Sequence, residues 1–545
     1  MSLSLIAEQR SISKLFLQRE QYVIPDFQRP YSWKLEQCRK LYDDIVEAYN
    51  TETDYFLGNI IIAVGERAKD KPHVVDGQQR IISLWIILKV LSVLKPDVRT
   101  LKDAICTYNW DGSKKDLKIN SEVLESDDKE WIKEIDKWGE KKFEEGINNC
   151  MKNGDFNYPV KEKSLVANAL YFYYTYKSFL EENGQEELHN YLRFLLEQVS
   201  ILPIELVGSN QEEANNRALT IFETINNRGM DLSDADIFKA KLYAKALTKE
   251  EQEDFMSHWT EFKKNCKNIK LSIDDGFRYY SHVLRGKAGT TKNEISLRDF
   301  FASQNSPLSQ KSYQEVMKDL LRIIELLTQY EEKKKERTEL AAWLQLIDNY
   351  TNVYPKYAAL VYLFHNGFDN EEKLIETLKR IVRYCYYRGS TTYVKYEVYN
   401  MICQISQKQL IDEYYQDDIG KDYFEYMGRL KYGYALLALY LEEPKALAPG
   451  YEYDRLLTTR DIGSLPSDWT RRSLEEHLDD LGNLAVLDTY KRSQTYSVKS
   501  KSYAKTSIKE LRDFINMNMG GISFSEMKRR TQYKKTILTN FFTGK

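Results

Sequence analysis

One segment near the N-terminus, Ile81–Leu94 with the sequence IISLWIILKVLSVL, limits the folds open to this chain. Its apolar residues fall on nearly all sides of a helix, and such a helix is buried inside a domain. It is shorter than the ~18 residues that a membrane-spanning helix needs, and Lys89 interrupts it. The N-terminal residues MSLSLIAEQRSISKL contain no long apolar stretch of the kind found in secretory signals. We therefore expect a cytoplasmic protein, not bound to a membrane, with a buried central helix.

Composition and charge narrow the classes of protein further. The chain has 545 residues, 42% of them hydrophobic, which at about 150 residues per domain suits several domains with real cores. Its six cysteines are scattered without a CxxC pair, so we expect buried thiols in a reducing compartment and no zinc ribbon. The net charge of −3 is unevenly distributed, because residues 491–545 hold 13 Lys or Arg and only 3 Asp or Glu. Such asymmetry favours contact with nucleic acid.

Strand and helix signals alternate in the first 245 residues. The β-branched run Tyr55–Val64 and the short His73–Val75 predict two strands ahead of the buried helix. Val199–Val207 predicts a third strand, and a helix over Asn210–Asn226 follows it. This alternation predicts a mixed domain of strands and helices.

Residues from about 233 to 441 are expected to be almost all helix. Apolar spacings of three and four mark four segments: Leu320–Tyr330, Glu339–Tyr354, Ala358–Phe364 and Glu372–Tyr386. Tyrosines are frequent here, and we interpret them as amphipathic residues on the surface of a helical scaffold, with a base-stacking groove as the alternative. Examples are Tyr384, Tyr386, Tyr387, Tyr393 and Tyr396. The expected fold class is α+β and predominantly helical.

A first polar motif is Ile24–Trp33, with the sequence IPDFQRPYSW. Its two prolines stiffen the backbone and disfavour helix. It offers Gln28 as an amide, Arg29 as a group that can bind a phosphate bidentately, and Tyr31 or Trp33 as rings that could stack on a base. The alternative is a turn with buried aromatic residues.

A second motif, Asp76-Gly77-Gln78-Gln79-Arg80, lies where a predicted strand meets the buried helix. Helix N-termini offer free N–H groups to phosphates, and Gly77 would let the backbone approach closely. Asp76 could hold Mg²⁺, Gln78 and Gln79 could orient a water, and Arg80 could offset developing negative charge. The alternative is an ordinary cap, with Asp76 at the N-cap and polar residues in the first turn.

A third motif spans Phe222–Leu232, with the sequence FETINNRGMDL. Gly229 suits the end of a helix, and Ser233 can cap the next one. Asn226 and Arg228 could face a pocket shared with the other two motifs. The alternative is that the motif only separates two helices.

Taken together and in order, IPDFQRPYSW, YFLGNIII, DGQQR and FETINNRG resemble the N-terminal domain of GmrSD-type (type IV) restriction proteins. This resemblance covers about residues 1–245. It implies a ParB/sulfiredoxin-like fold that binds and hydrolyses a nucleoside triphosphate (GTP, ATP or UTP) with Mg²⁺ or another divalent cation. The implied nucleotide-site residues are Gln28, Arg29, Asp76, Gln78, Gln79 and Arg80, with Asp76 as the metal ligand.

The C-terminal region is similar to the HNH-type nuclease domain of the same family. The similar segments are Leu430–Leu441 (LKYGYALLALYL), Leu481–Leu487 (LGNLAVL) and Lys528–Thr531 (KRRT). The similarity implies a metal-dependent ββα site in which a histidine activates water.

This chain departs from the HNH pattern at its central position. Residues 451–466, where the general-base histidine should lie, contain none. The best alignment puts Asp454-Arg455 there, Asn483 is retained, and His477 is the one histidine beyond residue 420. Three interpretations stay open: a degenerate nuclease that only binds DNA, a misaligned motif, or a rebuilt site. The rebuilt site would use Asp454, Arg455, Arg460, Asp461, His477 and Asn483.

The basic C-terminal segment favours DNA contact under each interpretation. KRSQTYSVKSKSYAKTSIK mixes cations with hydroxyl-bearing residues, which contact phosphates. FSEMKRRTQYKKTILTNFF predicts an amphipathic helix with basic residues clustered on part of its surface. A solvated charged face is the alternative.

These observations predict three domains: 1–245 binding a nucleotide, 246–420 helical, and 421–545 HNH-like and facing DNA. The leading hypothesis is an antiviral restriction protein whose nucleotide site gates action on phage or modified DNA. The alternative is a nucleotide-regulated DNA-binding or partner-recruiting subunit without nuclease activity, which would need a separate nuclease or defence partner. A stand-alone NTPase toxin is a third possibility, and homodimers are compatible with all three.

Overall fold

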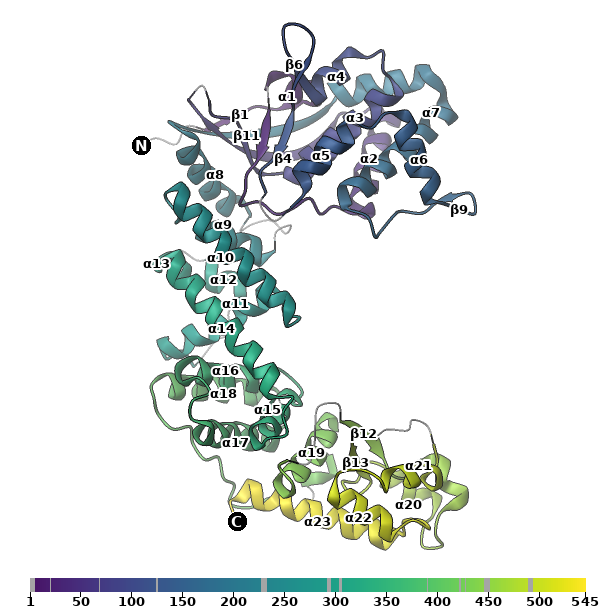
Figure 1. Ribbon diagram of the computed structural model, residues 1–545, viewed down its shortest axis with the longest axis vertical. Helices are drawn as coiled ribbons and strands as arrows, with labels where there is room; N and C mark the ends of the chain where they lie inside the picture. Colours follow the sequence, from purple (N-terminus) through teal and green to yellow (C-terminus); the bar gives the residue numbers. More distant parts are fainter. Residues whose placement is uncertain are drawn as a thin grey trace. The chain divides into compact units, whose positions relative to one another are not determined.

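A computed structural model divides the chain into two compact units, unit 1 (Met1–Thr260) and unit 2 (Glu261–Lys545) (Figure 1). The structure describes residues 5–19, 21–67, 69–123, 126–226, 233–291, 296–302, 306–389, 391–420, 423–426, 428–445, 451–488 and 494–545. The fold is α+β and predominantly helical, as expected. In the described part of the chain, no helix has the length and apolar character needed to cross a membrane. The domain boundaries at residues 245 and 420 stay predictions.

Unit 1 is organised around a mixed sheet that has seven strands within the described residues. Six lie in the order β1-β11-β4-β5-β3-β8, and β2 also pairs with β11. Strands β5, β3 and β8 are parallel, so their carboxyl ends meet at one edge of the sheet. The bounds are β1 Leu5–Ala7, β2 Arg10–Ser11, β3 Tyr22–Ile24, β4 Tyr55–Gly65, β5 His73–Asp76, β8 Ile119–Ser121 and β11 Val199–Gly208.

Strand β4 shows why these residues form a central strand. Its side chains alternate between the two faces of the sheet. Ile60 and Ile62 belong to the main core of unit 1, while Ile61 and Ala63 are equally buried on the other face, against which α8 packs. A strand covered on both faces has a continuous apolar sequence, as this one does. The three strands predicted from the sequence are confirmed as β4, β5 and β11.

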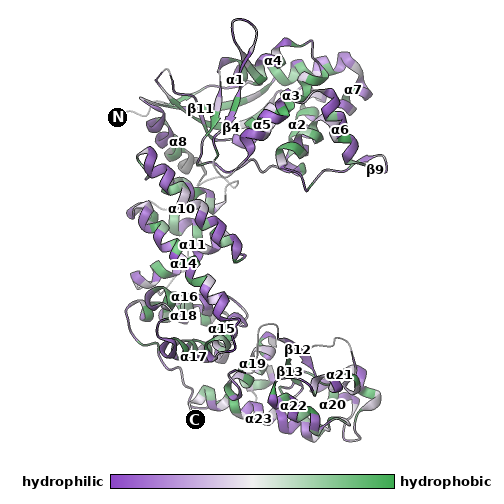
Figure 2. Ribbon diagram, viewed as in Figure 1, coloured by the Kyte–Doolittle hydropathy of each residue, from purple (hydrophilic) through white to green (hydrophobic). Residues whose placement is uncertain are grey.

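Helix α3, Gln78–Leu94, is the buried helix predicted from its all-round apolar sequence. It begins three residues earlier than expected, directly after the turn at Gly77. Trp85 is fully buried and donates its indole N–H to the Ile105 carbonyl oxygen at 3.1 Å. Figure 2 shows hydrophobic residues along α3 and along β4 and β11. The helix therefore fixes the interior of unit 1.

The helices of unit 1 are divided between the two faces of the sheet. Helices α1 to α7 contribute to the main core, and α8 packs against β4, β5 and β11 on the opposite face. The first helices are α1 Ile12–Gln18, α2 Leu35–Asn50, α4 Arg99–Ile105, α5 Asp128–Asp136, α6 Glu140–Cys150 and α7 Ser164–Glu197. Small hairpins are formed by β6 Cys106–Tyr108 with β7 Lys114–Leu117, and β9 Met151–Lys152 with β10 Asp155–Phe156. The last helices are α8 Gln211–Asn226, α9 Asp234–Tyr243 and α10 Lys249–Asn268, in which unit 1 ends.

Unit 2 begins with the helices predicted for the middle of the chain. They are α11 Ile273–Ala288, α12 Leu297–Ala302, α13 Pro307–Gln310, α14 Tyr313–Lys333, α15 Glu339–Asp348, α16 Tyr354–Asn366, α17 Glu371–Arg388 and α18 Thr391–Ser406. The single helix predicted over Glu339–Tyr354 is wrong, because α15 ends at Asp348 and α16 starts at Tyr354. Pro355 lies in the first turn of α16, where its missing N–H costs no hydrogen bond.

The tyrosines of this region are not all surface residues, which corrects the interpretation from the sequence. Tyr393 and Tyr396 are exposed, but Tyr386 is fully buried and donates its hydroxyl to the Leu346 carbonyl oxygen at 2.9 Å. Tyr384 is also buried. A hydroxyl that finds an internal acceptor makes a ring suitable for the core. Several tyrosines therefore hold helices together.

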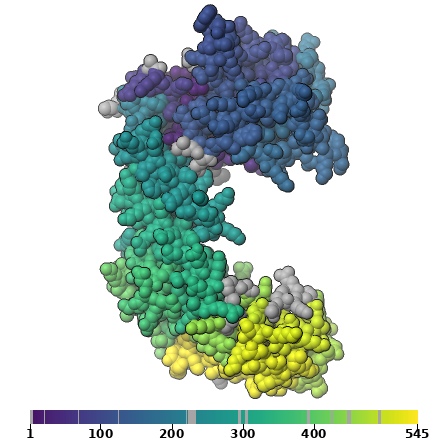
Figure 3. Space-filling model, viewed as in Figure 1, coloured from purple at the N-terminus to yellow at the C-terminus, as the bar shows by residue number. Residues whose placement is uncertain are grey.

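The C-terminal part of unit 2 pairs two short strands beneath helices. Strand β12 pairs antiparallel with β13, so Asp454 lies opposite Ala485 and Arg455 opposite Leu484. Figure 3 shows residues from α21 to the C-terminus, coloured yellow, at the surface of unit 2. The bounds are η1 Tyr423–Tyr426, η2 Gly428–Leu430, α19 Lys431–Glu442, β12 Glu452–Arg455, η3 Thr459–Ser464, α20 Arg471–Glu476, β13 Leu484–Leu487, α21 Tyr496–Tyr503, α22 Lys509–Met517 and α23 Phe524–Thr543.

Two cations of α23 lie inside this region, which corrects the predicted surface cluster. Arg530 is 5% exposed and donates two hydrogen bonds to the Glu510 carboxylate, at 2.7 and 2.9 Å. It also donates to the carbonyl oxygens of Gly482 and Leu484, and buried Lys534 donates to the latter at 3.2 Å. Both cations thus fasten α23 to the segment that leads into β13.

Glu510 is the anion that makes this burial possible. Burial alone would raise the pKa of its carboxyl, but the charges of Arg530 and Lys534 outweigh burial and hold that pKa at about 2. Burial and the nearby Arg530 lower the pKa of Lys534 to about 7. A carboxyl whose pKa is lowered on folding stabilises the fold above its ordinary pKa, and the stabilisation is lost as pH falls toward the folded value.

Replacing this anion should destabilise unit 2. Glu510→Gln leaves Arg530 buried without its partner, and we expect a loss of about 3–5 kcal/mol in the free energy of unfolding at pH 7. Urea titration measures it, with Glu526→Gln as control, because Glu526 pairs with Arg529 at the surface and should cost under about 1 kcal/mol. The difference between wild type and Glu510→Gln should shrink as pH falls from about 4.5 toward 2. Equal losses in both variants would contradict the assignment.

Candidate functional site

The turn between β5 and α3 has the geometry of an anion site. β5 ends at Asp76, and Gly77 is the N-cap of α3 with a positive φ of 84°. A Cβ on Gly77 would lie 2.3 Å from Cγ2 of Ile60, so a larger residue fits neither the conformation nor the space. Asp76 is therefore not the N-cap, contrary to the alternative drawn from the sequence. The first N–H groups of a long helix remain at this turn, where they favour negative charge.

Gln79 ties the Ile24–Trp33 motif to this turn. Its Oε1 accepts hydrogen bonds from the backbone N–H groups of Ser32, at 2.8 Å, and Trp33, at 3.2 Å. Its Nε2 donates to the Pro30 carbonyl oxygen at 3.2 Å. Both ends of the amide are therefore used in holding the loop. In this arrangement Gln79 positions the loop, and we no longer assign it to a water.

Gln78 differs from Gln79 in having a vacant acceptor. Its Nε2 donates to the Arg29 carbonyl oxygen at 3.1 Å, while Gln28 donates to the Val75 carbonyl oxygen at 2.9 Å. Gln78 is 5% exposed, and its Oε1 has no hydrogen-bond partner among the described residues. An unsatisfied buried acceptor is costly, so it marks a place where a ligand or water is expected.

Arg80 braces the turn against β4. Its Nη1 donates to the Leu57 carbonyl oxygen at 2.8 Å. Gly58, with φ of 99°, leaves room for it, because a Cβ there would lie 2.7 Å from Nη1. One end of the guanidinium is thus committed to the sheet. Its predicted role beside a phosphate stays a prediction that depends on its other N–H groups.

Tyr31 and Trp33 are held from behind by residues that sequence reasoning missed. The Tyr31 hydroxyl lies 2.7 Å from Oγ of Ser83 and accepts from Nδ2 of Asn168 at 3.0 Å. Asn168 also donates to the Trp33 carbonyl oxygen at 2.8 Å, and Asp128 accepts from the Tyr31 N–H at 2.7 Å. Tyr31 is 6% exposed, so its ring has no free face for a base, while stacking by the half-buried Trp33 stays a prediction. Asn168 lies far away in sequence, and no local signal marks it.

Arg29 is the accessible cation of the loop. Its side chain is 37% exposed, and its Nη1 lies 3.7 Å from Oδ2 of Asp236 in the first turn of α9. Ser233 caps that helix, as predicted, and accepts from the Asp236 N–H. A partly exposed ion pair of this length contributes only about 0–1 kcal/mol. The guanidinium can therefore be taken over by a stronger anion.

A second contact joins α9 to the same loop. The hydroxyl of Tyr243 donates to Oδ1 of Asp26 at 2.8 Å, and the rings of Tyr243 and Phe27 lie 4.8 Å apart. Burial raises the pKa of Asp26 despite this hydrogen bond. Strand register places His73 opposite Val23, so Asp26 leaves the sheet level with Asp76. Asp26 lies within the IPDFQRP motif, but its partner could not be found from the sequence.

The remaining predicted residues lie at the end of α8. The helix ends at Asn226, whose side chain is not described, and Arg228 lies outside the described residues, so both stay predictions. In the parts of the chain that the structure describes, no group of three or more His, Cys, Asp or Glu residues could hold a metal ion. A divalent cation at Asp76 would need other ligands, such as phosphates. The site thus brings together the first and second motifs.

The candidate residues of the C-terminal region are engaged in structural contacts. Asp454 accepts from buried Lys499 at 3.0 Å and from the Tyr503 hydroxyl at 2.7 Å. Asn483 is 1% exposed, accepts from the Leu457 N–H at 2.7 Å, and donates to two backbone carbonyl oxygens. Both hydrogen bonds to Asp454 end on its Oδ2, whereas both ends of the Asn483 amide are engaged. Asn483 therefore does not fit a role at the metal of an HNH nuclease.

Two further candidates, Arg455 and His477, pair with acids. Arg455 donates to Asp479 at 2.6 and 2.9 Å, and His477 lies 3.2 Å from the Asp480 carboxylate. Lys528 also approaches Asp480, at 3.7 Å. The hairpin thus brings Arg455 and Asn483 near each other, while His477 belongs to a separate charged group at the end of α20.

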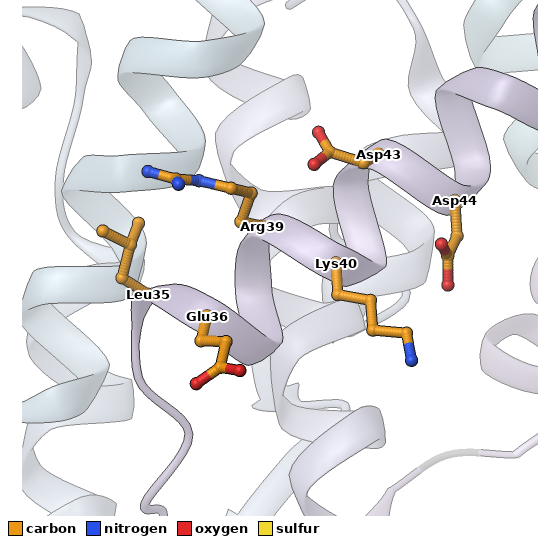
Figure 4. Close-up of a pocket in the computed structure, with 6 residues that line it drawn as sticks. All are labelled: Leu35, Glu36, Arg39, Lys40, Asp43 and Asp44. Atoms are coloured by element: carbon orange, nitrogen blue, oxygen red, sulfur yellow. The ribbon is translucent and has the colours of Figure 1, made fainter.

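An open depression of about 430 Å³ lies elsewhere on unit 1 and carries no comparable arrangement (Figure 4). Its side chains all come from α2 and diverge from one another. Opposite charges alternate along it at helical spacing, which is typical of a solvated helix face. The lining residues are Leu35, Glu36, Arg39, Lys40, Asp43 and Asp44.

The different duties of the two glutamines can be measured. Gln79→Ala removes the acceptor of the Ser32 and Trp33 N–H groups and should cost about 1–3 kcal/mol in stability. Amide hydrogen exchange at Ser32 and Trp33 should accelerate in this variant. Gln78→Ala removes one hydrogen bond to the Arg29 carbonyl and should leave both amides protected. Equal exchange in the two variants would refute the role of Gln79 in holding the loop.

Comparison with known proteins agrees with this geometry. Residues 12–243 match the family model described as GmrSD restriction endonuclease, N-terminal domain, and they include both the DGQQR turn and the loop it holds. An uncharacterized protein of Methanocaldococcus jannaschii is 24% identical in an alignment that covers 54% of this chain and 50% of that protein. The chain thus spans about half the length of that relative. Residues 12–243 are therefore similar to the N-terminal domain of the GmrSD restriction endonucleases.

Proposed function

We propose that the turn Asp76–Arg80 binds and hydrolyses a nucleoside triphosphate, and that the nucleotide controls a C-terminal region that contacts foreign or modified DNA. The observation that carries the first part is the buried Gln78 amide with a vacant acceptor at the N-terminus of α3, next to Arg29. The match of residues 12–243 to the N-terminal domain of a restriction endonuclease family supports the second part.

Phosphates would be held by the N-terminal end of α3 and by Arg29. The N–H groups after Gly77 favour anions, and a guanidinium binds a phosphate through two charge-assisted hydrogen bonds. Asp76 would carry a nucleotide-bound Mg²⁺, because Mg²⁺ in such sites takes one or two carboxylates and completes its shell with phosphates and water. The ion would reduce the negative charge that a nucleophile meets.

Gln78 is placed to hold the attacking water. Its amide is oriented by the bond from Nε2 to the Arg29 carbonyl oxygen, so Oε1 is left to accept a hydrogen bond from the water. Attack by the water oxygen on the terminal phosphorus breaks the bond to the bridging oxygen and releases a nucleoside diphosphate and phosphate. Arg29 would offset the charge that develops on the phosphoryl oxygens.

DNA contact is assigned to a row of exposed lysines. Lys501 lies in α21, Lys505 in the turn after it and Lys509 at the start of α22, so the three follow one another four residues apart in the sequence. All three are exposed, and none forms an ion pair with a described residue. By contrast, Arg530 and Lys534 are buried, and Arg529 pairs with Glu526 (Arg529–Glu526, 2.7 Å). The lysine row is therefore the better candidate for phosphate contacts.

A second candidate function is a nucleotide-regulated DNA-binding subunit that does not cut DNA. The fully bonded amide of buried Asn483 and the ion pair of Asp454 with buried Lys499 favour it, because a nuclease needs free donor atoms for its metal and its water. Such a subunit would act with a nuclease partner. A cleavage assay on modified phage DNA and plain plasmid, with Mg²⁺ and with and without nucleotide, separates the two. Cutting by the purified chain would refute the second function.

Removing the Asp76 carboxylate tests the nucleotide site. Asp76→Ala should lower hydrolysis of GTP, ATP and UTP by at least 100-fold while thermal unfolding stays close to that of the wild type. The control is Asp97→Ala, which removes an exposed carboxylate just beyond the other end of α3 and should hydrolyse normally. Phosphate release measures turnover. Normal turnover in a folded Asp76→Ala protein would remove this assignment.

Removing the lysine row tests the DNA surface. The triple change of Lys501, Lys505 and Lys509 to Ala should reduce the slope of log affinity against log salt concentration by about 3. Each lost phosphate contact removes about one unit from the magnitude of this slope. The matched control is the triple change of Lys129, Lys133 and Lys137, which are exposed at the same spacing along α5 and its C-cap. Fluorescence anisotropy with a duplex measures both slopes. An unchanged slope would move DNA contact elsewhere.

A further inference from the structure

Helix α9 is fastened to the Pro25–Pro30 loop at both of its ends. Asp236 in its first turn contacts Arg29, and Tyr243 at its last position donates to Asp26. These two residues lie two turns apart, so they point to the same side of the helix. The loop that carries Arg29 is therefore gripped by the DGQQR turn on one side and by α9 on the other.

The two fastenings differ in how they respond to an anion. Tyr243 is buried, and its ring packs on Phe27, so its contact does not depend on Arg29. The Arg29–Asp236 contact is 3.7 Å long, with both side chains partly exposed. Phosphate oxygens bind guanidinium at about 2.7–2.9 Å and carry more charge than one carboxylate. A phosphate at Arg29 would also repel Asp236.

We propose that Asp236 occupies Arg29 in place of the nucleotide phosphate, and that nucleotide binding releases the first turn of α9 while Tyr243 keeps its last turn attached. This inference rests on the proposed nucleotide site at the DGQQR turn. It makes Asp236 a positioning residue that competes with the substrate.

The competition has a signature that a purely structural role lacks. Removing the Asp236 charge frees Arg29, so Asp236→Asn should bind nucleotide about three- to fivefold more tightly than the wild type. An asparagine oxygen can still accept the 2.8 Å hydrogen bond from the Ser233 hydroxyl, so the variant keeps this contact and loses the charge that faces Arg29. Asp236→Glu keeps a carboxylate and should stay within about twofold of the wild type. Asp234→Asn removes a neighbouring charge from the same first turn and serves as the control for the helix dipole.

The experiment uses the full chain and fluorescent, non-hydrolysable analogues of GTP, ATP and UTP. Equilibrium titration gives the dissociation constants, and amide hydrogen exchange follows residues 234–238. Nucleotide should accelerate exchange there in the wild type, whereas Asp236→Asn should exchange rapidly before nucleotide is added. Exchange near Tyr243 should not change in either protein.

The possible outcomes separate the inference from the function on which it rests. Unchanged or weaker binding by Asp236→Asn, with a wild type that binds normally, would overturn the role of Asp236 and leave the nucleotide site standing. Tighter binding by Asp234→Asn as well would reduce the effect to a general charge effect and also overturn it. A wild type that binds none of the three analogues would overturn the nucleotide site itself. Tighter binding confined to Asp236→Asn, with faster exchange in the first turn, supports the proposal.

Discussion

The hydrogen bonds between the Gln79 side chain and the backbone of Pro30, Ser32 and Trp33 are the interaction on which the candidate site depends. They fix an irregular, proline-bounded loop against the first turn of a helix that is itself locked in the core. They act together with the hydrogen bond by which Gln78 holds the Arg29 carbonyl oxygen. A buried amide that satisfies three backbone groups can do this, because each group left unpaired would carry a desolvation penalty.

The C-terminal region depends on a comparable use of buried polar groups. Arg530 and Lys534 look like surface cations in the sequence, yet Glu510 and backbone carbonyl oxygens hold them inside. Net charge counted along the sequence therefore overstates the charge available to DNA. Asn483 shows the same effect, since a residue expected in a nuclease site instead clamps the loop before β13.

Much of the fold could be predicted from local patterns. The strands β4, β5 and β11, the buried helix α3 and the end of the helical region near Glu442 follow from periodicity and from proline positions. Of the candidate site, the residues of the turn and loop were found, because two motifs concentrate polar groups there. Asn168, Asp128 and Tyr243 were missed, because their contacts join segments far apart in the sequence. The break between α15 and α16 was also missed, since apolar spacing continues across it.

The sequence by itself determined that β4, β5 and β11 are strands, that α3 is a buried helix, and that the chain resembles GmrSD-type proteins. These properties depend on neighbouring residues and on motif order. Only the tertiary structure decided which of several similar side chains are hydrogen-bonded or buried and which are not. Gln78 keeps a vacant acceptor while Gln79 is fully bonded, and Lys505 is exposed while Lys534 is buried. The physical reason is that hydrogen bonding and burial depend on partners brought together by folding, which local sequence does not specify.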